Sequence, residues 1–255
     1  MPRVDRHLSL LALLLVAVSS AIGGRAARAQ QAEATAPPAP SQTDTLPAPL
    51  THYLGREIAV TMHYDGAGWL VRESRDREED TRKLLSALHV KPGQSVCDLG
   101  CGNGFYTLRL AKRVGDRGTV YAVDIQPEML HMLDVRAKGV GLKNIKPVLG
   151  NRVDPALPPG QLDLVLLVDV YHELSNPEEV LHAIRTSLKP EGRLVLAEFR
   201  LEDPEVPIKL LHKMSKEQVL KEIVPAGFRL VEQFDDLPWQ HLMFFQPDPA
   251  AQPRQ

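Results

Sequence analysis

Apolar runs alternate with segments of helical periodicity over most of the chain. A strand buried on both faces is apolar at nearly every position, whereas an amphipathic helix repeats its apolar residues three and four positions apart. The pattern therefore predicts a parallel sheet covered by helices on both faces. The predicted strands are 94–99, 119–124, 144–150, 162–169, 193–199, 228–234 and 241–245. The predicted helices are 76–88, 105–114, 127–133, 177–188 and 216–224.

The last two predicted strands, 228–234 and 241–245, have no helix between them. Consecutive strands joined by a short loop pair antiparallel, because parallel neighbours need a long crossover connection. We therefore expect a doubly wound α/β fold with a seven-stranded sheet, mostly parallel, that ends in an antiparallel C-terminal hairpin strand. Two helix starts have the spacing of a capping box, Asn176 with Glu179 and Ser215 with Gln218.

The N-terminal segment has a different pattern from the rest. Arg3 and Arg6 precede an apolar run over residues 8–22, and residues 27–29 (Ala-Arg-Ala) match a small-residue cleavage site. This pattern predicts a signal peptide cleaved near Ala29 and an exported, periplasmic protein. The run is shorter than the ~20 residues that span a bilayer, so no stable membrane span is expected after cleavage. The alternative is a protein anchored in the membrane by an uncleaved N-terminal segment.

Composition divides the remainder of the chain. Residues 30–50 are rich in Ala, Pro, Thr and Ser, which predicts a disordered linker. Residues 51–75 mix aromatic residues, arginine and glycine without clear periodicity, and either cover the site or serve only as a structural flap. The expected organisation is a signal peptide (1–29), a disordered linker (30–50), an N-terminal flap (51–75), the main α/β domain (76–247) and a disordered tail (248–255).

A strand, a glycine-rich turn and a helix follow one another at the first strand of the sheet. Asp98 lies near the end of that strand, and glycine follows at alternate positions, Gly100, Gly102 and Gly104. Glycine lets the backbone turn tightly and approach a ligand, and the helix after it begins with free N–H groups. The spacing differs from the G-x-G-x-x-G of a dinucleotide site. The Asp98 carboxylate would repel a pyrophosphate and attract an amino group.

The stretch 98–104, Asp-Leu-Gly-Cys-Gly-Asn-Gly, resembles the first motif of the class I S-adenosylmethionine-dependent methyltransferases. The Leu-Lys-Pro-Glu-Gly before the strand 193–199 and the terminal hairpin are similar to the same family, so the resemblance covers roughly residues 76–245. It implies a Rossmann-like fold and S-adenosylmethionine as the cofactor, with the acid and the three glycines at its site. A tight turn without a ligand is the alternative for the glycine loop alone.

Three further positions extend the predicted cofactor site. Asp124 ends the second strand, where an acid can accept hydrogen bonds from both hydroxyls of a ribose, although a helix-capping acid is the alternative. Ile125 and Gln126 follow it and would flank the adenine. Related enzymes place an acid after the third strand to bond the adenine amine. This chain has Asn151 there, whose carbonyl oxygen can still accept.

Polar residues follow the fourth strand, where open parallel sheets bind their ligands. Asp169 ends this strand and is assigned to the cofactor site. His172 is the candidate catalytic base, with Tyr171 or Glu173 to position it. A base is needed only if the acceptor must lose a proton during methyl transfer. The alternative is that Tyr171 and His172 line the pocket or cap the next helix.

Net charge and cysteine content bear on the binding of nucleic acid and of metal ions. The formal net charge is −2 and the sequence pI is about 6.5, so no nucleic-acid partner is expected. The two cysteines, Cys97 and Cys101, are expected to be free thiols because a disulfide would distort the glycine turn between them. They are also too few to hold a metal ion, and no metal site is expected.

The sequence therefore predicts methyl transfer from S-adenosylmethionine to a small or medium-sized acceptor. The alternative is a non-catalytic module of the same fold that binds S-adenosylmethionine or a nucleoside in the periplasm, which Asn151 and the export signal favour. A nicotinamide-dependent oxidoreductase is disfavoured by the glycine spacing and the terminal hairpin. Neither the acceptor nor the oligomeric state follows from the sequence.

Overall fold

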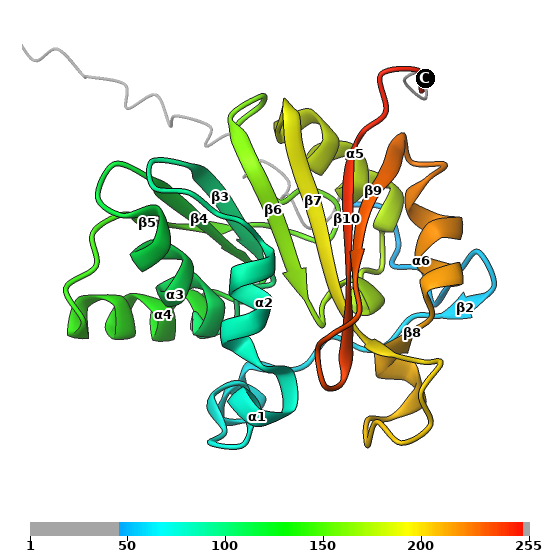
Figure 1. The fold of residues 1–255 in the computed structure, drawn as a ribbon, viewed down its shortest axis with the longest axis horizontal. Coiled ribbons are helices and arrows are strands. Elements are labelled where there is room, and N and C mark those ends of the chain that lie inside the picture. The colour runs from blue at the N-terminus through cyan, green and yellow to red at the C-terminus, as the bar shows by residue number, and fades with distance from the viewer. Residues whose placement is uncertain (1–45, 252–255) are drawn as a thin grey trace, which may run out of the picture. The chain divides into compact units, whose positions relative to one another are not determined.

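The computed structural model describes residues 46–251, and seven of the eight strands of its main sheet form one continuous path. These are β3 (Ser95–Leu99), β4 (Thr119–Asp124), β5 (Ile145–Leu149), β6 (Leu162–Val168), β7 (Leu188–Arg200), β9 (Phe228–Phe234) and β10 (Gln240–Pro247). Their order across the sheet is β5-β4-β3-β6-β7-β10-β9 (Figure 1). A two-residue strand, β8 (Lys213–Met214), pairs with the C-terminal end of β7. The predicted signal peptide and most of the predicted linker lie outside the described residues, as do residues 252–255.

The strands from β5 to β7 run parallel, and β10 lies antiparallel to both β7 and β9. The predicted fold class is therefore confirmed, with β10 inserted between β7 and the edge strand β9. The chain builds the sheet outward from β3 through β4 to β5 and then returns to place β6 on the other side of β3. Adjacent parallel strands whose connections leave in opposite directions open a crevice at their carboxyl ends. This switch point positions the site.

Helices cover both faces of the sheet, as the alternation of strands and helices predicted. The helices are α1 (Arg75–Glu79), α2 (Thr81–Ala87), α3 (Phe105–Val114), α4 (Pro127–Gly139), α5 (Pro177–Ser187) and α6 (Lys216–Ile223). Apolar residues of α2 and α3 pack in one core cluster, and those of α5 and α6 pack in another. Alternate residues of β3 divide between the two clusters, with Val96 in the first and Cys97 in the second.

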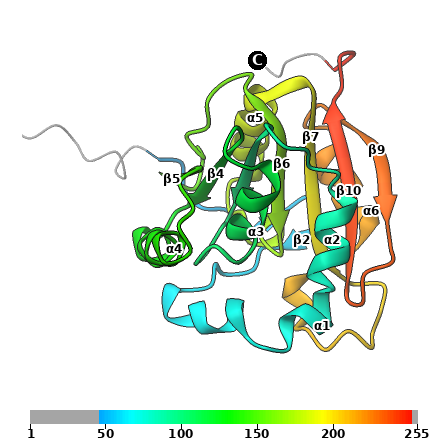
Figure 2. The ribbon, with the colours of Figure 1, turned by 60° about the vertical axis from the view of Figure 1, so that its left-hand side comes forward.

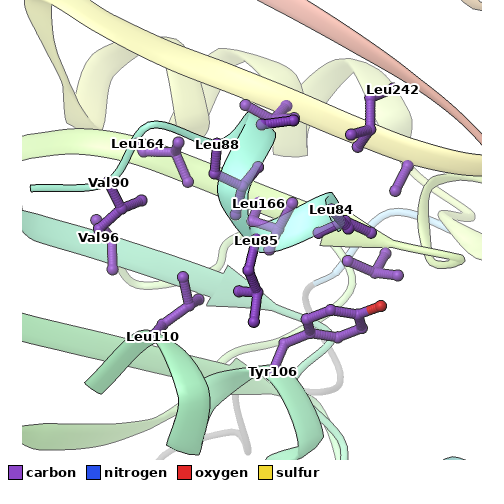
Figure 3. Packing of buried hydrophobic residues seen from close by; sticks show 14 of the residues in the cluster. Leu84, Leu85, Leu88, Val90, Val96, Tyr106, Leu110, Leu164, Leu166 and Leu242 are labelled. Carbon is purple, nitrogen blue, oxygen red and sulfur yellow. The ribbon is translucent and has the colours of Figure 1, made fainter. Parts of the chain in front are cut away.

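Figure 3 shows the first cluster, where Leu84 and Leu85 of α2 and the adjacent Leu88 lie over the sheet beside Leu166 and Leu242. Leu84 and Leu88 are fully buried. Burying a leucine side chain stabilises the fold by about 1.5–3 kcal/mol. Apolar contact with the sheet therefore holds α2 in place, and α2 follows directly on α1, whose residues face the cavity described below.

The helix predicted over residues 76–88 is wrong in one respect, because it is divided into α1 and α2 at Asp80. Asp80 has a φ of 44°, in the left-handed region that ends a helix. Its carboxylate then accepts a hydrogen bond from the Lys83 backbone N–H at 3.1 Å and caps α2. A short polar side chain that bonds its neighbouring backbone tolerates this conformation, so one residue can both end α1 and begin α2.

The two predicted capping boxes have different outcomes. The Ser215 hydroxyl accepts a hydrogen bond from the Gln218 backbone N–H at 3.1 Å, as predicted. Asn176 lies at the N-cap of α5 but makes no side-chain cap hydrogen bond, so the capping box predicted for Asn176 and Glu179 is wrong. The Asn176 amide instead donates to the Ala48 carbonyl at 3.3 Å. The competing partner comes from a segment that no local pattern brings there.

The N-terminal segment 51–75 packs along the carboxyl ends of the strands. It contains the hairpin β1 (His52–Tyr53) and β2 (Arg56–Glu57) and the 3₁₀ helix η2 (Tyr64–Val71). The Ala59 N–H donates to the His172 carbonyl at 3.1 Å, and the Asn103 amide donates to the Ala67 carbonyl at 2.9 Å. Figure 2 shows this blue and cyan segment running beneath the sheet toward α1. It therefore forms one wall of the site.

Two short 3₁₀ helices complete this end of the molecule. They are η3 (Tyr171–Glu173), directly after β6, and η4 (Leu210–His212), directly before β8. Within residues 46–251, none of the helices combines the length and hydrophobicity needed to cross a bilayer.

Candidate functional site

A cavity of about 690 Å³ lies where β3, β4 and β6 end. Cavities of roughly 300–1,000 Å³ are typical of small-molecule and cofactor sites. Gly104 and Tyr171 are the two predicted site residues that do not line it. The predicted residues that do line it are Asp98, Gly100, Gly102, Asp124, Ile125, Gln126, Asn151, Asp169, His172 and Glu173. Residues predicted from four separate stretches of sequence thus share one cavity.

Asp98 is a buried acid with 3% of its surface exposed. Its Oδ2 accepts a hydrogen bond from the Thr107 hydroxyl at 2.5 Å. Burial raises the pKa of Asp98 to about 6, while the Thr107 hydrogen bond and the charge of Arg75 oppose the rise. Within the described residues, no lysine or arginine forms an ion pair with this carboxylate. Asp98 therefore offers a cationic ligand a carboxylate whose charge the protein has not already neutralised.

The three glycines of the loop all have positive φ, at 72° for Gly100, 52° for Gly102 and 85° for Gly104. A Cβ on Gly100 would lie 2.5 Å from the Val170 side chain, and one on Gly104 would overlap Leu133 of α4. Only glycine therefore allows both this backbone conformation and this packing. Gly100 and Gly102 shape the cavity wall, whereas Gly104 lets the start of α3 pack against α4.

Asp124 is bound to the glycine loop and to its own turn. Its Oδ2 accepts from the Gly102 N–H and its Oδ1 accepts from the Gln126 N–H, both at 2.9 Å. Burial raises the pKa of Asp124 and these backbone hydrogen bonds oppose the rise. A carboxylate has about four lone-pair sites, so acceptor capacity remains for a ligand. Asp124 is thus held in a fixed orientation with acceptor capacity toward the cavity it lines.

Ile125 and Gln126, the residues predicted to flank the adenine, have different surroundings. Ile125 is 42% exposed, which leaves an apolar surface at the cavity. The Gln126 side chain donates to the Met62 carbonyl and accepts from the Tyr64 N–H, so it ties the N-terminal segment to the end of β4.

Asn151 lines the cavity, but its side-chain carbonyl oxygen is already occupied. It accepts hydrogen bonds from the Val153 and Asp154 N–H groups, both at 2.9 Å. A carbonyl oxygen has two lone pairs, and both are used here. The predicted contact from an adenine amine to this oxygen therefore lacks a free acceptor in this conformation.

Asp169 combines burial with backbone strain. Its φ is 54°, and its Oδ2 accepts from the Gln240 amide at 2.8 Å. Its Oδ1 is buried and has no hydrogen-bond partner within the described residues. Burial, followed by the charges of Glu79 and Glu198, raises the pKa of Asp169 well above its usual range. An unpartnered buried oxygen beside a cavity is costly unless a ligand pairs with it.

His172 is 2% exposed and sits between two partners. Its Nδ1 lies 2.6 Å from Glu198 Oε2, and its Nε2 lies 3.1 Å from His212 Nδ1. A carboxylate only accepts, so His172 Nδ1 carries the proton in this pair, and Nε2 has a lone pair only when the ring is neutral. Glu173 Oε1 lies 3.9 Å from the same Nε2. Burial raises the pKa of Glu173 to about 7, against the opposing charge of His172.

Tyr171 is buried, and its side chain has different partners from the His172 ring. Its hydroxyl donates to Glu222 Oε2 at 2.9 Å, and Glu222 also forms an ion pair with Arg56 at 2.7 Å. The residue that holds the His172 ring is Glu198, whereas Tyr171 or Glu173 was predicted for that role. The Tyr171 backbone N–H does contribute, because it donates to Glu198 Oε1 at 2.9 Å.

Sequence reasoning missed Glu198 and His212. Glu198 is a charged residue within the apolar run of β7 and is fully buried, which is a signal that a sequence search could use. His212 lies in η4, after a long loop, and nothing in its neighbourhood distinguishes it from a surface histidine. Arg75 and Glu79 of α1 also line the cavity as an ion pair at 2.9 Å.

The raised pKa of Asp98 predicts how stability depends on pH. An unfolded aspartate has a pKa near 3.9, so the folded protein binds this proton more tightly than the unfolded chain does. The free energy of unfolding of the ligand-free protein should therefore fall as pH rises from about 4 to about 6, by about 3 kcal/mol from this group. Urea unfolding at several pH values, with Asp98→Asn for comparison, measures it. Parallel pH profiles for the two proteins would contradict the assignment.

Comparison with known proteins identifies similar chains. A family model described as a methyltransferase domain matches residues 90–242. Ubiquinone/menaquinone biosynthesis C-methyltransferase UbiE of Legionella pneumophila is 34% identical over 119 residues, which cover 46% of this chain and 48% of that protein. Demethylmenaquinone methyltransferase of Lactobacillus johnsonii is 31% identical over 160 residues, covering 62% of this chain and 64% of that protein. The chain spans about half the length of the first of these relatives.

One solved structure is matched by this chain over the whole length of that structure. It is described as a SAM-dependent methyltransferase from Aquifex aeolicus, with a TM-score of 0.69 and 26% sequence identity. The match covers 73% of this chain and 100% of that one. The α/β architecture and its antiparallel C-terminal strands are therefore shared with that structure.

Proposed function

The chain belongs to the methyltransferase-domain family, and we propose that it transfers a methyl group from S-adenosylmethionine to a small or medium-sized acceptor. One observation carries this proposal: Asp98 and Asp124 line the same cavity, with the backbone of Gly100 and Gly102 between them. Two carboxylates beside a glycine-rich loop suit a ligand that has an amino group at one end and a ribose diol at the other.

The residues present fit this donor. Asp98 would receive its amino group, since no lysine or arginine of the described chain is paired with that carboxylate. Asp124 would accept the ribose hydroxyls with its remaining lone pairs. The exposed apolar surface of Ile125 would cover one face of the adenine. The unpartnered Asp169 Oδ1 supplies a further buried polar atom with which a ligand can pair.

The donor supplies a methyl group that is already activated by a positively charged sulfur. The task of the chain is then to align the acceptor and exclude water, and orientation can lower a barrier by up to about 7–11 kcal/mol. The N-terminal segment contributes Met62, Trp69 and Leu70 to the wall, so it covers the reacting end of the cavity. Gln126 anchors this cover to the end of β4.

His172 is the side chain best arranged to act on the acceptor. Glu198 fixes the ring with the proton on Nδ1, so Nε2 of a neutral ring carries the lone pair and faces His212 Nδ1 at 3.1 Å. That lone pair can accept a proton from the acceptor or ligate a cation. Both roles need the Glu198 carboxylate, because it holds the tautomer and the orientation of the ring.

Similarity to two methyltransferases named for quinone biosynthesis supports a small-molecule acceptor. The cavity of about 690 Å³ must hold donor and acceptor together, which also favours a small acceptor. A binding module without turnover is the competing proposal, and the occupied carbonyl of Asn151 is the observation in its favour.

Calorimetry with S-adenosylmethionine and S-adenosylhomocysteine on the purified protein tests the donor site. We expect saturable binding of both at one site per chain. Transfer of a radiolabelled methyl group to a panel of hydroxylated aromatic and quinol acceptors then separates an enzyme from a binding module. Failure to bind either nucleoside would contradict both proposals, whereas binding without transfer to any acceptor would favour the module.

We also propose that the protein is exported, on the strength of the arginines, apolar run and Ala-Arg-Ala site of residues 1–29. Fusing these residues to a reporter that is active only outside the cytoplasm should give a processed, active reporter. An inactive reporter would contradict export, and an active reporter that keeps residues 1–29 would indicate a membrane anchor instead.

A further inference from the structure

Three side chains from separate elements bring potential ligand atoms together in the cavity. They are His172 and Glu173 of η3 and His212 of η4. One nitrogen from each histidine and one carboxylate oxygen lie within 4.8 Å of one another. All three residues line the same cavity as the proposed donor site. Two imidazoles and one carboxylate form a donor set that binds divalent transition metals while leaving coordination positions open.

The contact between His172 and Glu198 is of the kind that supports a metal-binding histidine. A ligating histidine commonly donates its second ring N–H to a carboxylate, which fixes the tautomer and makes the ligating nitrogen more basic. Here His172 donates from Nδ1 to Glu198 at 2.6 Å and directs Nε2 toward the cluster. Glu198 is fully buried and is itself oriented by the Tyr171 N–H at 2.9 Å. The first ligand is therefore already held in place.

The charge balance of the cluster also favours a cation. Glu173 and Glu198 both lie close to His172, and across residues 46–251 neither forms an ion pair with a lysine or arginine. Arg56, which donates to the His172 carbonyl, pairs with Glu222 instead. Buried carboxylates are normally paired with a cationic side chain or coordinate a metal. Apart from backbone N–H groups, the imidazoles are the partners that these two carboxylates have among the described residues.

The spacing of the nitrogens is suitable for a shared ion. His172 Nε2 and His212 Nδ1 are 3.1 Å apart. Two nitrogens that each bind one metal at about 2.0–2.1 Å are separated by roughly 3 Å when they occupy neighbouring coordination positions. The carboxylate of Glu173, 15% exposed, has room to close the remaining distance of 3.9 Å to Nε2.

We propose that His172, Glu173 and His212 form a binding site for a divalent transition metal ion of the Zn²⁺ class. The absence of thiolate ligands and the mixture of nitrogen and oxygen donors favour Zn²⁺, Co²⁺, Mn²⁺ or Fe²⁺ over Cu⁺. The ion would face the cavity, so its open positions could take an oxygen atom of a small molecule bound there. The two cysteines alone predicted no metal site, whereas these ligands come from elements 40 positions apart.

Metal binding is measured directly, so the test does not depend on methyl transfer. The full chain is purified without a polyhistidine tag, freed of metal with a chelator, and titrated with Zn²⁺ in a calorimeter and with Co²⁺ in an absorption spectrometer. We expect one saturable site per chain and a Co²⁺ spectrum typical of nitrogen and oxygen ligands at low coordination number. His212→Ala and Glu173→Gln should weaken binding by more than the 10–100-fold typical of outer-shell changes, and Glu198→Gln should weaken it within that range.

His182→Ala is the matched control, because His182 is an exposed histidine on α5 and does not line the cavity. It should bind both ions as the unaltered chain does. Circular dichroism confirms that each variant is folded before titration. The proposal is overturned if neither Zn²⁺ nor Co²⁺ binds saturably. It is equally overturned if folded His212→Ala and Glu173→Gln retain full affinity, and His172 would then act on the acceptor through its lone pair alone.

Discussion

Asp124→Ala is expected to lower the affinity of the protein for S-adenosylhomocysteine by at least about 100-fold. The Asp124 carboxylate would accept from both ribose hydroxyls, and each hydrogen bond to a charged group contributes about 1.5–3 kcal/mol. Two such bonds correspond to roughly 10²–10⁴ in affinity. The substitution also frees the Gly102 N–H, which the carboxylate now holds at 2.9 Å, so the glycine loop loses part of its support. Calorimetric titration of the folded variant gives the loss.

Asp163→Ala is the matched control for this loss. Asp163 also accepts a hydrogen bond from a backbone N–H, that of Ser95 at 2.8 Å, but at the amino ends of β3 and β6. It does not line the cavity. Asp163→Ala should therefore reduce stability without reducing affinity. Undiminished binding by folded Asp124→Ala would remove Asp124 from the ribose site, and an equal loss in both variants would indicate a general effect of stability.

The parts of the site that could be predicted from sequence are those set by local patterns. Each strand of the sheet is a short apolar run, and ligands of such sheets bind at their carboxyl ends. Asp98, Asp124 and Asp169 each end a run of this kind, so their common cavity follows from the fold class alone. His172 and Glu173 were expected at the same edge of the sheet, because they follow the predicted strand that ends at Asp169.

The parts that could not be predicted depend on contacts between distant segments. His212 reaches His172 only because β8 pairs with the far end of β7 and brings η4 over the cavity. The Asn176 amide bonds Ala48 rather than the first turn of its own helix, because an irregular segment passes beside it. The break at Asp80 is local, but a left-handed residue between two short helices has the same polar pattern as one longer helix. Periodicity does not separate these cases.

His172→Asn is expected to lower the rate of methyl transfer by about 10²–10⁴-fold, the range that a positioned acid–base group contributes. Asparagine keeps an N–H near the position of Nδ1 and so still donates to the buried Glu198 carboxylate, which His172 now bonds at 2.6 Å. It removes the ring atom Nε2 and its lone pair. Alanine would instead remove the side-chain partner of that buried carboxylate and leave it the Tyr171 N–H, at a cost of about 1–3 kcal/mol in stability. The measurement is the turnover of an acceptor found with the unaltered protein.

Two comparisons separate a direct role of His172 from a structural one. Affinity for S-adenosylhomocysteine should be unchanged in His172→Asn, because the ring contacts none of the residues assigned to the amino group or the ribose. Glu198→Gln keeps the ring but replaces the carboxylate that orients it, so it should lower turnover less and shift the pH dependence of turnover. Full turnover in folded His172→Asn would exclude Nε2 as the base in methyl transfer. The methyl transfer would then rest on alignment of the two substrates by the cavity alone.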